Sequence, residues 1–81
     1  MISSEQIRAA RALIRWDQAE LAKHANVSVE TIKRLEKING PLLTATGKTL
    51  QAIQSTLEHA GIIFIAQNGN GPGVRLRDRQ S

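Results

Sequence analysis

Apolar residues recur every three or four positions along the first sixty residues, which is the spacing of amphipathic helices. This spacing predicts four helices, over about residues 4–15, 17–25, 28–37 and 47–59. Their apolar positions are Ile7, Ala10, Leu13 and Ile14, then Leu21, Ala22 and Ala25, then Ile32 and Leu35, and last Leu50, Ile53 and Leu57, with apolar Val27 in the turn between the second and third helices. The fold class expected from this pattern is mainly α.

Polar residues support these helix boundaries. Each predicted helix follows a side chain that can accept a hydrogen bond from the first turn, namely Ser3 or Ser4, Asp17, Ser28 and Thr46. Glu20 lies three residues after Asp17, at the spacing of a capping box. Asn26 separates the second and third helices where a left-handed backbone is expected, a conformation that Asn tolerates better than most residues. The segment Asn39-Gly40-Pro41 ends the third helix, and Gly61 is placed to end the fourth.

The spacing of the apolar residues changes after Gly61. Residues 62–65 form a β-branched and aromatic run, and residues 74–77 alternate between apolar and basic. The residues between these two runs contain Asn-Gly twice and Gly-Pro-Gly, which predicts a β-hairpin with a long loop. We therefore expect one domain with a helical part over 1–60, a hairpin over 61–77 and a flexible tail over 78–81.

The chain has 11 Lys and Arg against 7 Asp and Glu, a net charge of +4 and a pI of about 10.4, which favours an anionic partner. It has no cysteine, and His24 and His59 are expected to be surface or half-buried polar residues, so we expect no metal site and no cofactor. The longest strongly apolar run, residues 62–66, is too short for a membrane span. With no signal peptide expected, the predicted location is the cytoplasm, without membrane contact.

Residues 17–36 read as two short helices joined by a tight turn, the helix-turn-helix pattern that places its second helix in the DNA major groove. At 100° per residue, Ile32 and Leu35 point to one side of that second helix. The other side carries Glu30, Lys33, Arg34 and Lys37, with Val29 at its margin. Three cations on one face suit a DNA reader, and Glu30 can accept a hydrogen bond from cytosine N4. The alternatives are a solvated charged face and a plain helical hairpin of a bundle.

Two segments, Gln18-Ala19-Glu20-Leu21-Ala22 and Ile32-x-x-Leu35-Glu36, resemble the XRE family of DNA-binding proteins, which are similar to lambdoid phage repressors and Cro. The resemblance extends over roughly residues 2–60 and implies a lambda-repressor-like fold. It also implies that Gln18 contacts a backbone phosphate, that Val29, Glu30 and either Lys33 or Arg34 contact base edges, and that Arg11 pairs with Glu36. Two departures are Asn26 in place of the usual turn glycine, and Val and Glu in place of Gln at the base-reading positions. No known operator can therefore be carried over.

The function expected on these grounds is a sequence-specific transcriptional regulator, a repressor, that binds a palindromic operator in double-stranded DNA as a homodimer. The predicted base readers are Val29, Glu30, Lys33 and Arg34. The predicted phosphate ligands, besides the amides that open the second and fourth helices, are Gln18, Ser28, Thr31, Lys37 and Asn39.

No nucleophile, base and orienting group recur at a catalytic spacing, so we do not expect an enzyme. The loop Gly69-Asn70-Gly71-Pro72-Gly73 lacks the spacing of a phosphate-binding loop and precedes a strand rather than a helix. Trp16 is expected to be a packing residue.

The hairpin is the predicted dimerisation segment, through Ile62, Ile63, Phe64, Ile65, Val74 and Leu76. Its first strand is apolar on both faces, and an isolated hairpin is marginal in water and leaves open edges. Joining two hairpins across a two-fold axis removes both problems.

The alternative function is an antitoxin or another protein-interaction module with the same fold. A toxin gene next to the gene of this protein would favour that alternative.

Overall fold

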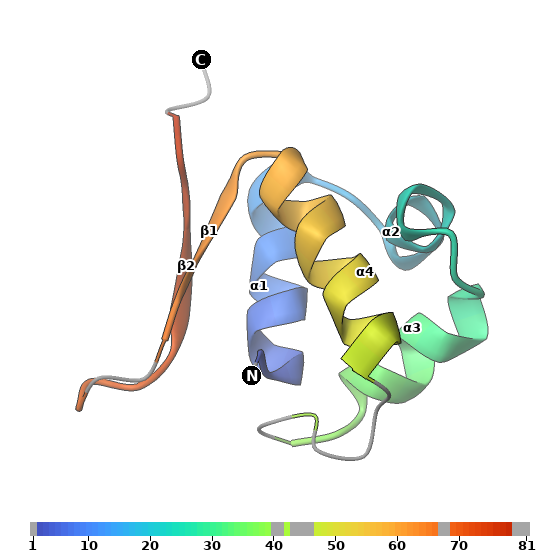
Figure 1. Ribbon diagram of the computed structural model, residues 1–81, viewed down its shortest axis with the longest axis horizontal. Helices are drawn as coiled ribbons and strands as arrows, with labels where there is room; N and C mark the ends of the chain where they lie inside the picture. Colours follow the sequence, from blue (N-terminus) through green and yellow to red (C-terminus); the bar gives the residue numbers. More distant parts are fainter. Residues whose placement is uncertain (1, 40–41, 43–46, 67–68, 79–81) are drawn as a thin grey trace.

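A computed structural model describes residues 2–39, 42, 47–66 and 69–78. The elements in chain order are α1 (Ser4–Ile14), α2 (Gln18–Ala25), α3 (Val29–Glu36), α4 (Gly47–His59), β1 (Ile62–Ile65) and β2 (Gly73–Leu76). They form three layers, with the hairpin on one side, α1 and α4 in the middle, and α2 and α3 on the other side (Figure 1). The prediction of a mainly helical chain that ends in an antiparallel hairpin is confirmed.

The bounds agree with the predicted ones at α4 and β1 and differ slightly elsewhere. The first helix stops at Ile14 because Arg15 is left-handed, with φ 60°, and its N–H bonds back to the carbonyls of Ala12 and Arg11. The second strand begins at Gly73, one residue before the predicted start. The proposed cap Thr46, the helix breakers Gly40 and Pro41, and tail residues 79–81 lie outside the described residues.

Side-chain caps begin the first three helices. Ser3 accepts a hydrogen bond from the N–H of Gln6 (3.1 Å), and the Gln6 side chain accepts one from the N–H of Ser3 (2.9 Å). This complete capping box was not foreseen, because only the serine was recognised. Asp17 accepts from the N–H of Glu20 (2.7 Å) and Ser28 from the N–H of Thr31 (3.1 Å), as predicted.

One hydrophobic core joins all six elements. Every apolar residue predicted for the four helices and the turn between the second and third is either buried in this core or packed against it. Two buried core residues lie outside the predicted elements, Ile2 before α1 and Leu42 before α4. The N–H of Leu42 donates to the carbonyl of Ile2 (3.4 Å), so these two segments close the end of the core together.

The two faces of the hairpin differ in what they contact. β1 lies against α4 and β2 against α1, in a register that pairs Ile62 with Leu76 and Phe64 with Val74. These four side chains face the helices, since Ile62 is buried and the other three pack against the core. By the alternation of a strand, Ile63 and Ile65 point outward, on the face opposite to the helices. Among the described residues, no helix is both long and apolar enough to cross a bilayer.

Gln6 fastens the hairpin to the helices. Its side-chain nitrogen donates to the carbonyl oxygens of Ile65 (3.2 Å) and Gly73 (2.9 Å), one on each strand. Its oxygen is already held by the capping box at the start of α1. One buried amide therefore links the first turn of α1 to both strands.

Candidate nucleic-acid interface

A short turn joins α2 to α3. Asn26 has φ 58° and ψ 43°, which confirms the left-handed residue predicted for this position. The N–H of Val27 then donates to the carbonyl of Ala22 (3.0 Å) and closes the turn. Val27 is half-buried and packs against the core. The turn therefore fixes how α3 leaves α2, since its hydrogen bonds return to α2 and its apolar side chain packs against the core.

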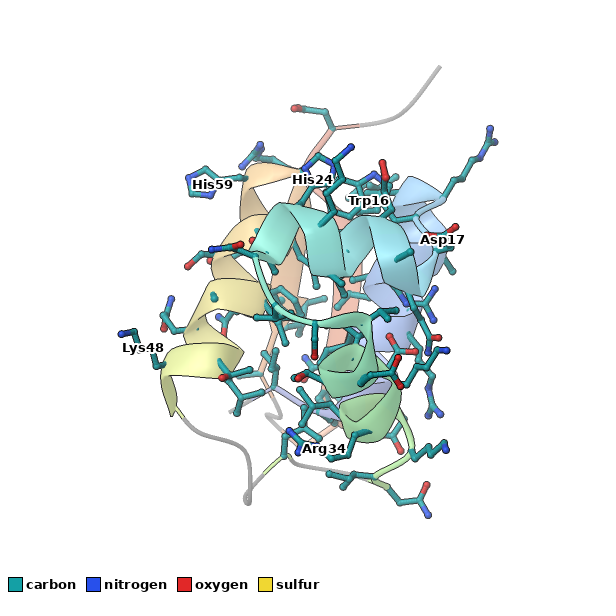
Figure 2. All side chains as sticks on the ribbon, turned by 90° about the vertical axis from the view of Figure 1, so that its right-hand side faces the viewer. Trp16, Asp17, His24, Arg34, Lys48 and His59 are labelled. Carbon is teal, nitrogen blue, oxygen red and sulfur yellow. The ribbon has the colours of Figure 1, made fainter. Side chains whose placement is uncertain are left out.

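The third helix separates a buried face from an exposed one. Ile32 and Leu35 are buried, and the opposite side carries exposed Glu30, Lys33, Arg34 and Lys37. Figure 2 shows Arg34 at the opposite end of the molecule from Trp16 and His24. Val29, the fourth predicted base reader, is half-buried and packs against the core, so only part of its surface is available.

The cations of this face have no salt-bridge partner among the described residues. In the part of the chain that the structure describes, the salt bridges of Arg and Lys involve Arg8, Arg11 and Arg77, and none involves Lys33, Arg34 or Lys37. The exposed face of α3 therefore presents three uncompensated positive charges beside one carboxylate, that of Glu30. A surface of this kind attracts a polyanion.

The remaining predicted phosphate ligands lie around the two ends of α3. Ser28 and Thr31 are at its beginning, where their hydroxyl oxygens are 2.9 Å apart. Lys37 caps its end and Asn39 follows two residues later, and both are exposed. The partial positive charge of the helix start adds to the attraction for a phosphate at Ser28.

Glu36 holds three helices together beneath this surface. Its carboxylate accepts two hydrogen bonds of 2.7 Å from the guanidinium of Arg11 in α1 and one of 3.0 Å from the side chain of Gln18 in α2. The backbone carbonyl of Glu36 also accepts from Arg8 (3.0 Å). The hydrogen bond with Glu36 raises the pKa of Arg11 above its ordinary value, so the guanidinium stays charged. The Arg11–Glu36 pair implied by the family resemblance is present.

Gln18 has a structural contact that sequence reasoning missed. One of its amide hydrogens is directed to Glu36, so it joins the start of α2 to the end of α3. The sequence contained an indication of this contact. Glu36 falls on the same side of α3 as buried Ile32, and a carboxylate on a buried face needs hydrogen-bond partners. The backbone N–H groups of Gln18 and Ala19 have no partner among the described residues and remain available to a phosphate.

The predicted dimerisation residues divide between the two faces of the hairpin. Ile62 is 1% exposed and belongs to the hydrophobic core of the chain, and Phe64, Val74 and Leu76 also face inward. Only Ile63 and Ile65 point away from the helices. The prediction that both faces of β1 are apolar holds, but its own helices cover one of them.

The described residues contain no group of three or more His, Asp and Glu side chains that could hold a metal ion. Comparison with protein-family models found no match for the chain, and no curated protein matches it either.

Proposed function

We propose that this protein binds double-stranded DNA with sequence specificity and acts as a homodimeric transcriptional repressor, with α3 in the major groove. The observation that carries the proposal is the exposed face of α3, where Lys33, Arg34 and Lys37 have no acidic partner in the described part of the chain while the opposite face is buried. An exposed helix of this kind fits the major groove of B-DNA.

Base contacts come from the side chains at the centre of the exposed face. Arg34 can form two parallel hydrogen bonds to the O6 and N7 atoms of a guanine, and Lys33 can reach a second acceptor. Glu30 can accept from the amino group of cytosine, and the exposed part of Val29 can contact a thymine methyl group. These four residues account for specificity in this proposal.

Phosphate contacts flank the base contacts and set the position of α3 in the groove. We assign them to the N–H groups at the start of α2, to Ser28 and Thr31, and to Lys37 and Asn39. The Glu36 network supports this arrangement, because it holds the start of α2 and the end of α3 in one orientation before DNA arrives. Less conformational freedom is then lost on binding.

Dimerisation is assigned to the outward face of the hairpin, around Ile63 and Ile65. Figure 1 shows the hairpin and α3 on opposite sides of the layer formed by α1 and α4, so a second copy on the hairpin leaves α3 uncovered. A two-fold dimer with its α3 helices about 34 Å apart requires an inverted-repeat operator.

The test is selection of bound sequences from a random DNA pool, followed by footprinting on the region upstream of its own gene. We expect an inverted repeat to be enriched by the unchanged protein. The Arg34→Ala variant should lose the preference at one base pair of each half-site. Arg77→Ala removes the same charge from the end of the hairpin and should enrich the same repeat as the unchanged chain. If the unchanged protein enriches no sequence, the proposed function is wrong.

A further inference from the structure

A pocket unrelated to the exposed face of α3 lies between α2 and the end of α4. It has a volume of about 350 Å³ and is lined by Trp16, His24, Thr56, His59 and Ala60. This volume lies within the range of small-molecule sites. Figure 2 shows Trp16, His24 and His59 at the end of the molecule opposite to Arg34.

One wall of the pocket is a preformed aromatic surface. The rings of Trp16 and His24 are stacked, with centroids 4.5 Å apart and planes 12° from parallel. Trp16 also packs against the core, which holds the indole in place. The carboxylate of Glu20 lies 3.7 Å from Nε2 of His24, so the edge of the imidazole faces this acid. The stacked rings therefore offer flat surface to a planar ligand.

The other wall supplies hydrogen-bonding groups. Nδ1 of His59 lies 2.8 Å from the carbonyl oxygen of Ser55, and since a carbonyl only accepts, Nδ1 is the donor. Nε2 of His59 then remains for a ligand. The hydroxyl of Thr56 has no hydrogen-bond partner among the described residues. None of the five lining residues is acidic.

We propose that this pocket binds a small planar aromatic acid. The aromatic ring lies against the Trp16–His24 stack, and the carboxylate lies between the hydroxyl of Thr56 and Nε2 of His59, from which it accepts hydrogen bonds. These groups suit a carboxylate because the Thr56 hydroxyl has no partner among the described residues, and because Nδ1 of His59 is already bonded to the carbonyl of Ser55, which leaves Nε2 for the ligand. The ligand bridges α2 and α4 and touches no residue of α3, so it does not compete with DNA for the same surface.

The experiment uses the complete chain without DNA and follows the single tryptophan. Its indole N–H gives one peak in a proton–nitrogen correlation spectrum, which reports on Trp16 alone. Titration with benzoate should shift this peak saturably, with a Kd on the order of 1 mM for so small a ligand. Benzyl alcohol, which lacks the charge, and cyclohexanecarboxylate, which lacks the aromatic ring, should each bind about tenfold more weakly.

Two variants test the polar wall. Thr56→Val and His59→Leu should each raise the Kd for benzoate by about five- to tenfold while the peaks of α3 stay in place. Ser55→Ala is the matched control, because it keeps the backbone carbonyl that holds His59 and should leave the Kd unchanged. No saturable shift, equal shifts with all three probes, or an unchanged Kd in both variants would overturn the proposal. None of these outcomes affects the proposed binding of DNA, since the titrations contain no DNA.

Discussion

Arg11 and Glu36 are 25 residues apart in sequence and are joined by two hydrogen bonds of 2.7 Å, with the Glu36 side chain only 4% exposed. The same guanidinium also donates to the carbonyl of Trp16 (3.0 Å), just before α2. The pair therefore connects α1, the segment that leads into α2, and the end of α3. Its removal should affect both stability and the geometry of the proposed DNA-binding surface.

Arg11→Met should destabilise the fold by about 3 kcal/mol, because it leaves a buried carboxylate without its charged partner. For a domain of this size, each kcal/mol lowers Tm by about 4–8 °C, which thermal unfolding followed by circular dichroism can measure. The double variant Arg11→Met with Glu36→Leu removes both charges and should be more stable than the single variant. A double variant that melts at or below the temperature of Arg11→Met would show that the buried charge is not the cause.

Arg34→Ala should weaken binding to the selected operator by about 1–3 kcal/mol and relax the preference at one base pair, without a change in Tm, since the side chain is exposed. Gln18→Ala should instead weaken binding to all sequences alike, because the backbone N–H groups at the start of α2 are then no longer held in place by the contact with Glu36. It should also lower the stability by about 1–2 kcal/mol, because its hydrogen bond to the buried Glu36 is lost. Competition binding with single-base operator variants, together with thermal melts, separates the two effects. A uniform loss of affinity across sequences for Arg34→Ala would contradict its assignment as a base reader.

Asp17→Ser should strengthen DNA binding by about fivefold. The carboxylate caps α2 through the N–H of Glu20, next to the N–H groups assigned to a phosphate, so it repels the ligand that these groups attract. Serine caps a helix about as well and carries no charge, so Tm should hardly change. Fluorescence anisotropy with a labelled operator measures the change. An unaltered affinity would place the start of α2 away from the DNA.

Salt dependence tests the phosphate contacts as a group. About five contacts per subunit predict that log affinity falls with log salt with a slope near −9 for a dimer, at roughly −0.9 per phosphate. Lys37→Ala should reduce the slope by about 2 in the dimer, one contact for each subunit. Titrations at four or more salt concentrations are sufficient, and a nearly flat dependence would contradict DNA binding altogether.

If the chain is the proposed dimer, Ile63→Asp should convert it to a monomer in analytical ultracentrifugation and reduce operator affinity, since the substitution places a charge in the assigned interface. Ile63 points outward, so the monomer should keep its helicity. Phe64→Asp is a poorer test, because Phe64 packs against the core and its change disturbs the subunit itself. Arg75→Gln, on the strand beside Ile63 and on the same face, is the control and should remain dimeric. If Ile63→Asp stays dimeric, the interface lies elsewhere, and α4 is the next surface to test.

The sequence by itself determined the elements of this fold, because their causes are local. The spacing of apolar residues predicted α4 and β1 at the observed bounds. Asp17, Asn26 and Ser28 act as predicted, because a cap or a left-handed residue bonds to groups within four positions of itself. The exposed face of α3 was predictable for the same reason, since Ile32 and Leu35 mark the face that must be buried.

Only the tertiary structure decided which of these elements meet and what lies between them. Gln6 reaches carbonyls 59 and 67 residues away, and nothing in the local pattern selects those partners. The alternation of a strand places Ile62 and Ile63 on opposite faces of β1. It does not decide which of the two faces the helices, since both residues are apolar. The pocket beside the stacked Trp16 and His24 rings likewise depends on how α2 packs against α4. Such contacts arise when whole elements pack against one another. The local sequence of an element does not specify that packing.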